Sequence, residues 1–191
     1  MTLIRLTLVI GLLIASIVIF WRIAPSRSKL LILRDATHFP VISGFNLNRQ
    51  EFEFPRDFEG DLNLVIVAFQ QYQQRTVNTW LPYAQELEST FSKFIYYELP
   101  TISDRSVLSR TFINEGMRAG IPDQTARERT ITLYLNKGEF RSALDIPNED
   151  DIYLFLVDQN GNVFWHSSGE YSEAKASELI EVIEAQSQQG K

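Results

Sequence analysis

The sequence contains no cysteine and only two histidines among its 191 residues. Without cysteine the chain has neither an attacking thiolate nor a second sulfur to resolve a mixed disulfide, so thiol–disulfide exchange by its own residues is excluded. The histidines, His38 and His166, do not show the spacings that bring two imidazoles to one zinc ion. The sequence also lacks a G-x-S-x-G elbow and a glycine-rich phosphate loop. We therefore expect no metal, no cofactor and no catalysis.

Basic charge is scarce as well. Lys and Arg number 18 against 24 Asp and Glu, which gives a formal net charge of -6 and a pI near 5.0. No basic stripe with interleaved aromatic residues is present, so nucleic-acid binding is not expected. The length fits one globular domain with enough chain to bury a real core.

A long uncharged run stands at the amino terminus, from Leu6 to Trp21. As a helix these residues would span about 24 Å, which is short for a bilayer core. The flanking Arg5 and Arg22 can snorkel to the two interfaces while the tryptophan sits at the headgroups. We therefore expect a transmembrane anchor over residues 1–23.

A cleaved signal peptide is the alternative for this run. The bulky residues Phe20–Ile23 offer no small-x-small cleavage site, which favours a retained anchor. A linker is predicted over residues 24–38, where Pro25 marks its start. More positive charge follows the run than precedes it, so the positive-inside rule predicts the soluble domain on the cytoplasmic or matrix side. The following charges are Arg22, Arg27, Lys29 and Arg34.

Residues 39–191 show the alternating strand and helix patterns of an α/β domain. The strand at Leu62–Phe69, the helix at Gln73–Ser92 and the strand ending at Pro100 predict a β-α-β unit with parallel strands. Asn160-Gly161 between two apolar runs predicts a β-hairpin. The other predicted elements are edge strands at Phe39–Val41 and Glu51–Pro55, a helix from an Asp104 N-cap to about Ala119, a charged connection at Asp123–Arg129, a strand at Thr130–Leu135, a short helix at Lys137–Leu144, hairpin strands at Ile152–Val157 and Asn162–His166, and a terminal helix with Ala176, Leu179, Ile180 and Ile183 inward.

The β-α-β unit resembles the start of a thioredoxin, with Trp80 and Pro82 in its helix. An ungapped reading places the C-x-x-C box on Gln74 to Val77, so both redox cysteines are missing. Redox-active relatives enter the hairpin strand through a cis-proline, and the matching position here is Ile152. A cis bond before a residue other than proline costs about 2.5 to 4 kcal/mol, so we expect a trans bond there. The resemblance implies a thioredoxin-like three-layer α/β/α domain with a mixed central sheet, but without its reaction.

A narrower resemblance covers about residues 39–185. The chain resembles the cysteine-poor, thioredoxin-like family of mitochondrial ATP synthase assembly factors, assembly factor ten. Peroxiredoxin-like domains are the second family that it resembles. The resemblance implies a non-catalytic, membrane-associated chaperone that holds an integral membrane subunit of the proton-translocating sector. The alternative is an enzyme of unrecognised kind, or a redox accessory of a cysteine-bearing partner. The residues that carry the resemblance are Phe39-Pro40, Leu64–Tyr72 with Trp80, Lys137–Phe140, Ala143–Ile146, Tyr153–Asp158 and Trp165–Gly169.

The candidate client surface lies at the edge of the sheet where the redox site would be. Open α/β sheets usually bind ligands at the carboxyl ends of their parallel strands. The alternative is an ordinary solvated loop. Trp165 is a further candidate contact, although a tryptophan on a hairpin strand is more often part of the core. The loop residues are Gln70, Gln71, Tyr72, Gln73, Gln74 and Arg75.

Overall fold

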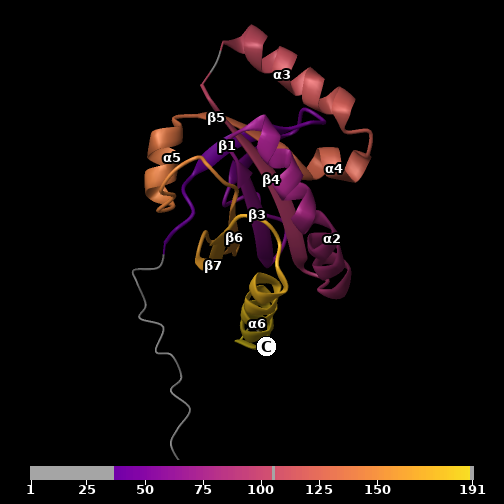
Figure 1. Cartoon of the computed structure of the whole chain (residues 1–191), viewed down its shortest axis with the longest axis vertical. Coiled ribbons are helices and arrows are strands. Elements are labelled where there is room, and N and C mark those ends of the chain that lie inside the picture. Colours follow the sequence, from indigo (N-terminus) through magenta and orange to yellow (C-terminus); the bar gives the residue numbers. More distant parts are fainter. Residues whose placement is uncertain (1–36, 105, 190–191) are drawn as a thin grey trace, which may run out of the picture. The chain divides into compact units, whose positions relative to one another are not determined.

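The computed structural model describes residues 37–104 and 106–189. These residues form one seven-stranded mixed sheet with helices packed on it (Figure 1). The elements, in chain order, are β1 (Ile42–Asn46), β2 (Glu51–Phe54), β3 (Leu62–Ala68), η1 (Gln71–Gln73), α2 (Gln74–Thr90), β4 (Phe94–Ser103), α3 (Val107–Gly120), α4 (Gln124–Arg129), β5 (Ile131–Leu135), α5 (Lys137–Ala143), β6 (Tyr153–Val157), β7 (Val163–Ser168) and α6 (Glu173–Gln189).

The sheet has the strand order β2-β1-β5-β4-β3-β6-β7. Strand β3 pairs parallel to β4 and antiparallel to β6, which confirms the predicted β-α-β unit and the mixed sheet. Because side chains alternate along β3, Leu64 and Ile66 pack with α2 and α6, whereas Val65 and Val67 pack with α5 and the amino-terminal aromatics. Two cores therefore cover the two faces of one sheet, as the predicted three-layer fold requires.

The first predicted strand, at Phe39–Val41, is wrong. Phe39 is fully buried, with its ring 5.5 Å from that of Phe58, and its N–H donates to the carbonyl of Gly161. The strand begins one residue after Val41, at Ile42, which pairs with Phe54 of β2, and β1 pairs with β5 on its other side.

The strand predicted to end at Pro100 continues to Ser103. Pro100 lies opposite Ala68, the last residue of β3, and a proline is tolerated where pairing with a neighbour ends. Thr101–Ser103 then pair with β5, so β4 extends three residues beyond its pairing with β3.

The crossover from β4 to β5 differs from the prediction at two points. Asp104 is not the N-cap of α3, because Ser106 accepts the N–H of Ser109 and Asp104 pairs with Arg110 instead. The charged stretch that follows is itself a helix, α4, capped by Asp123, whose Oδ1 accepts the N–H of Ala126 at 2.7 Å. No side chain that the structure describes in α3 or α4 is buried.

The carboxyl-terminal half follows the prediction closely. The β6–β7 hairpin turns through Gly161, which has a φ of +88°, the left-handed conformation that an Asn-Gly turn needs. Helix α6 buries Ala176, Leu179 and Ile183, while Ile180 is half-buried. The predicted transmembrane anchor lies outside the described residues, as does most of the linker. No helix within residues 37–104 and 106–189 combines the length and apolar character needed to cross a bilayer.

Candidate functional site

The loop predicted as a client surface lies at the carboxyl edge of the parallel strands. Strands β3, β4 and β5 run in the same direction, so their carboxyl ends meet at one edge of the sheet. The chain leaves β3 through Gln70, forms the single turn η1 and enters α2. Gln70, Gln71, Tyr72, Gln74 and Arg75 are all exposed, and Tyr72 is 66% exposed.

Gln73 holds the backbone of this loop in place. Its side chain is buried, and its Oε1 accepts the N–H groups of Phe69 at 2.8 Å and Gln70 at 3.1 Å. Its Nε2 donates to the carbonyl of Glu149 at 2.8 Å, in the segment that precedes β6. The loop therefore presents its exposed side chains from a backbone that three hydrogen bonds of one glutamine hold in place.

Gln74, at the position of the first missing cysteine, covers a buried carboxyl group. Its Nε2 donates to Oε2 of Glu98 at 3.1 Å and to Oδ1 of Asn78 at 3.0 Å. Glu98 lies on β4 and is only 6% exposed. Burial raises the pKa of this carboxyl group above its ordinary value of 4.5, and the Gln74 amide opposes part of that rise. An acidic group therefore lies beneath the exposed amide where a redox thioredoxin would have its first sulfur.

The other two former redox positions hold core residues. Val77 is 1% exposed and Ile152 is fully buried, and both pack in the core between the sheet and α2. The peptide bond before Ile152 is trans, as expected. The second sulfur and the cis-proline are thus replaced by apolar side chains that stabilise the fold.

Trp165 does not join the exposed loop. It is 8% exposed and packs against Trp80, with ring centroids 6.3 Å apart, which matches the alternative of a core tryptophan. Trp80 in turn donates its indole N–H to the carbonyl of Gly169 at 2.9 Å. The two tryptophans therefore connect α2 to the end of β7 inside the core.

A polar cleft of about 580 Å³ lies at the same edge of the sheet. Lys137 and Glu149 form an ion pair at its side, and the Lys137 ammonium lies 5.5 Å from the centre of the Phe69 ring. Glu149 also receives the Gln73 amide, so the cleft and the loop share a partner. No local sequence pattern indicates this cleft, because its lining comes from three separate segments of the chain. The lining residues are Ser103, Asp104, Leu135, Asn136, Lys137, Gly138 and Glu149.

The exposed side chains at this edge offer hydrogen bonding and an aromatic surface. The exposed groups of the loop are amides, a phenol and a guanidinium, which donate and accept hydrogen bonds. Among residues 37–104 and 106–189, no group of three or more His, Asp or Glu is arranged to hold a metal ion. Polar groups around an exposed aromatic ring suit a protein partner, because aromatic and arginine side chains are the types that most often carry interface energy.

The buried carboxyl group predicts a dependence of stability on pH. Because the folded pKa of Glu98 lies above its unfolded value, the folded state loses stability as pH rises through that folded pKa. Glu98→Gln keeps an acceptor for Gln74 but cannot ionise. We expect the variant to gain stability over the wild type at pH 7 and to lose that advantage near pH 4, measured as free energies of unfolding in urea. Glu181→Gln, at an exposed position on α6, is the control, and an equal response of both variants to pH would contradict the expectation.

Solved structures with related folds support the thioredoxin-like assignment. A protein from Aquifex aeolicus VF5, described as a candidate electron transfer protein, superposes with a TM-score of 0.54 at 10% identity, covering 77% of this chain and 94% of its own. The exposed lipoprotein thioredoxin of Streptococcus pneumoniae strain TIGR4 gives a TM-score of 0.50 at 11% identity, covering 76% of this chain and 99% of its own. At such identities the likeness shows the fold, which confirms the thioredoxin-like prediction.

Sequence comparison identifies the family. No curated protein sequence matches the chain. The profile of the ATP10 protein family, however, matches residues 23–185, which is most of the chain and contains the whole sheet. The match confirms the resemblance that the sequence motifs predict. The chain therefore belongs to the ATP10 protein family, the ATP synthase assembly factors that its sequence resembles.

Proposed function

We propose that the protein is a redox-inactive, membrane-anchored chaperone that holds an integral membrane subunit of the F-type ATP synthase during assembly. The observation that carries this function is the family match over residues 23–185 in a chain without cysteine. The family supports a role in ATP synthase assembly. The missing thiols support a role by binding, because no thiolate is present to react.

The edge formed by Gln70 to Arg75 is the proposed contact with the client. Its side chains are exposed and polar, and Gln73 holds its backbone in place. A surface whose backbone is already ordered loses less conformational entropy when a partner binds. The carboxyl edge of the sheet is also where ligands of this class of fold usually bind.

The uncharged run from Leu6 to Trp21 is the proposed anchor. A tether at the membrane would keep the domain close to a client that is itself inserted there, which raises the effective concentration of the two partners. The excess of Arg and Lys after the run supports a domain on the cytoplasmic or matrix side.

The test replaces Gln71, Tyr72 and Arg75 by alanine in the full-length chain. We expect the free energy of unfolding to change by less than about 0.5 kcal/mol per site, because the three side chains are exposed. Client binding should weaken by about 2 kcal/mol or more if the edge contains a true hot spot. Cells carrying the variant should accumulate the protein normally and lose assembled ATP synthase membrane sector, measured on native gels.

The matched control replaces an exposed glutamine, an exposed aromatic residue and an exposed arginine at the β1–β2 edge by alanine. These residues are Gln50, Phe45 and Arg56. This triple variant should assemble the ATP synthase as the wild type does. Wild-type assembly in the loop variant would show that the Gln70 to Arg75 edge does not bind the client. Wild-type assembly in a full deletion would remove the assembly function itself.

A further inference from the structure

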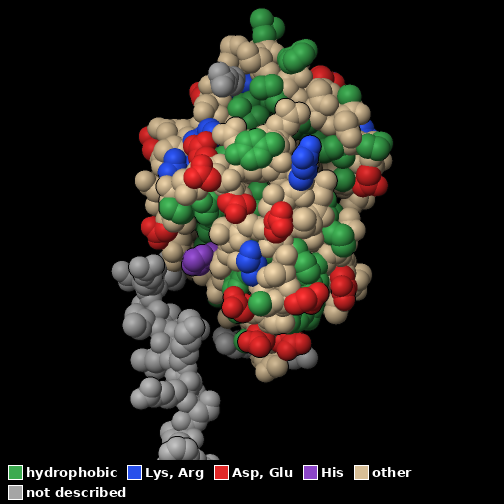
Figure 2. All heavy atoms as spheres, in the orientation of Figure 1, with side chains coloured by type: hydrophobic (Ala, Val, Ile, Leu, Met, Phe, Trp, Pro, Cys, Tyr) green, Lys and Arg blue, Asp and Glu red, His purple; other side chains and the backbone are tan. Residues whose placement is uncertain are grey.

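Helix α3 carries an apolar face that no part of residues 37–104 and 106–189 covers. Leu108 is 85% exposed and Phe112 is 82% exposed, one helical turn apart. Gly116 and Ala119 continue the same face and are also exposed. Hydrophobic side chains gather at the end of the molecule that α3 occupies (Figure 2). Single exposed apolar residues are ordinary, but a stripe along one helix is typical of a binding face.

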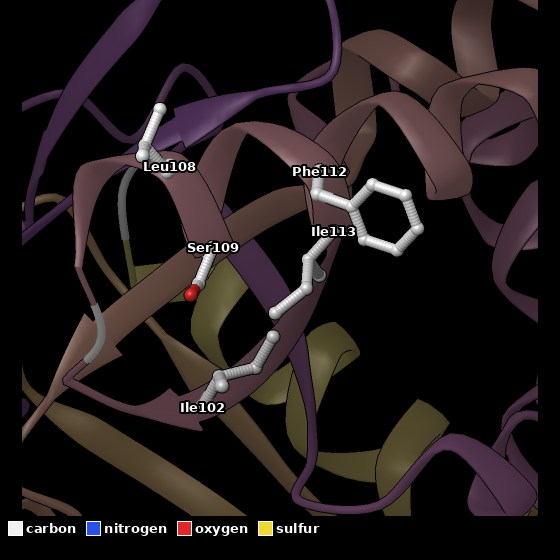
Figure 3. A pocket seen from close by; sticks show the side chains of 5 residues that line it. All are labelled: Ile102, Leu108, Ser109, Phe112 and Ile113. Atoms are coloured by element: carbon white, nitrogen blue, oxygen red, sulfur yellow. The ribbon is translucent and has the colours of Figure 1, made fainter.

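A cleft of about 510 Å³ opens beside this stripe, between α3 and the end of β4. Figure 3 shows Ile102 of β4 and Ile113 of α3 pointing toward one another across it, while Phe112 projects from the helix. The space next to Gly116 and Gly120 is also open, because a Cβ atom added at either glycine would have nothing within 4 Å. Glycines four residues apart let a second helix approach closely. The face thus combines the two projecting side chains of Leu108 and Phe112, the cleft beside them and the open surface at the glycines.

The charges around the stripe favour an uncharged occupant. Glu115 lies on the same helix face, between Phe112 and Ala119, and accepts from the Arg49 guanidinium at 2.8 Å. Arg110 pairs with Asp104, so both charges are neutralised within the domain. A lipid surface suits this face of α3 less well than an uncharged protein segment does. Helices that lie on membranes carry a strongly basic polar face, whereas α3 has two arginines against one glutamate in a chain of net charge -6.

We propose that the face of α3 formed by Leu108, Phe112, Gly116 and Ala119 docks an uncharged apolar helix of the membrane subunit that the protein holds. This role rests on the proposed function and names the client segment that the site binds. Phe112 and Leu108 anchor the client helix, a client side chain enters the cleft above Ile102 and Ile113, and the client backbone passes over Gly116. The domain thereby covers apolar surface that the subunit later buries in the assembled membrane sector.

The direct test places a photoreactive p-benzoylphenylalanine at position 112 of the full-length chain in its own membranes. We expect crosslinks that mass spectrometry maps to an apolar helix of a membrane-embedded ATP synthase subunit. The control probe stands at position 41, where the valine is 74% exposed on another part of the domain. Crosslinks from position 112 only to lipid, to a second copy, or to residues 6–21 of the same chain would overturn the proposal. So would a yield no higher than that of the control probe.

Two sets of variants test the same face by assembly. Leu108→Gln combined with Phe112→Gln should lower the assembled membrane sector about tenfold, as expected for loss of interface anchors. Its melting temperature should stay unchanged, because both side chains are exposed. Gly116→Leu keeps the apolar residues but fills the open space, and it should cause a similar loss of assembly without loss of stability, since leucine favours a helix more than glycine. Val41→Gln and Gly116→Ala are the controls and should assemble normally.

The outcomes separate this docking face from the proposed function. Normal assembly in a full deletion removes the function itself. Lost assembly in the deletion, with normal assembly in both the double variant and Gly116→Leu, overturns the α3 face alone. If the double variant fails to accumulate, the decision falls to Gly116→Leu, for which normal assembly overturns the proposal and lost assembly at wild-type protein levels supports it.

Discussion

A chain carrying Val67→Asp is expected to yield no folded domain. Val67 is fully buried near the carboxyl end of β3, where it lies between Leu99 of β4 and Tyr153 of β6. The aspartate would be desolvated among the apolar side chains of the core, at a cost of several kcal/mol. That cost is a large share of the total stability of a domain, about 5 to 15 kcal/mol. Circular dichroism of the full-length chain in detergent should show loss of the cooperative unfolding transition.

Val41→Asp provides the control with the same chemical change. Val41 is 74% exposed, so the new carboxylate stays in water and the free energy of unfolding should change by about 0.5 kcal/mol or less. A cooperative transition in Val67→Asp close to that of Val41→Asp would mean that β3 is not the central buried strand.

Trp80→Ala should cost about 3 to 5 kcal/mol of stability, the range for removing a large buried aromatic side chain. Trp80 is fully buried, and its ring centroid lies 6.3 Å from that of Trp165 and 5.4 Å from that of Tyr171. Its indole N–H also loses the bond to the Gly169 carbonyl. Urea unfolding followed by circular dichroism gives the free energy directly.

Trp80→Phe separates packing from hydrogen bonding. Phenylalanine retains an aromatic ring but no donor for Gly169, so the variant should be destabilised less than Trp80→Ala. A loss of less than about 1 kcal/mol in the alanine variant, well below the range for a buried aromatic side chain, would contradict the central place of the two tryptophans.

The elements that the sequence predicted well have strong local patterns. The alternation and β-branched residues of β3, the 3.6-residue spacing of Val77, Trp80 and Ala84 in α2, and the Asn-Gly turn each act within a few residues. The errors have non-local causes. Pro100 suggested a strand end, but pairing of β4 with β5 carries the strand past it. The polar run of α4 has no apolar face to reveal it, and only its Asp123 cap marks the start.

In the candidate site, too, local features were predictable and non-local contacts were not. Position in the β-α-β unit was enough to place the exposed Gln70 to Arg75 loop, because the carboxyl end of a strand is a topological feature. The support of that loop was not predictable, since Gln73 binds Glu149, 76 residues away, and Gln74 binds Glu98 on the neighbouring strand. The exposure of Phe112 likewise depends on how α3 lies against the sheet, whereas its spacing alone would equally suit a buried face.

The strand order also constrains the synthesis of the protein. β3 has β4 as its neighbour within the same β-α-β unit, but its other neighbour, β6, enters only near the end of the chain. While the ribosome makes the residues in between, one edge of a strongly apolar strand has no native partner, and such an edge readily pairs with other chains. A nascent domain of this kind is therefore itself in need of protection until Tyr153–Val157 has emerged. Chains that end before Tyr153 are expected to aggregate, and pauses in translation just upstream of it would lengthen the vulnerable interval.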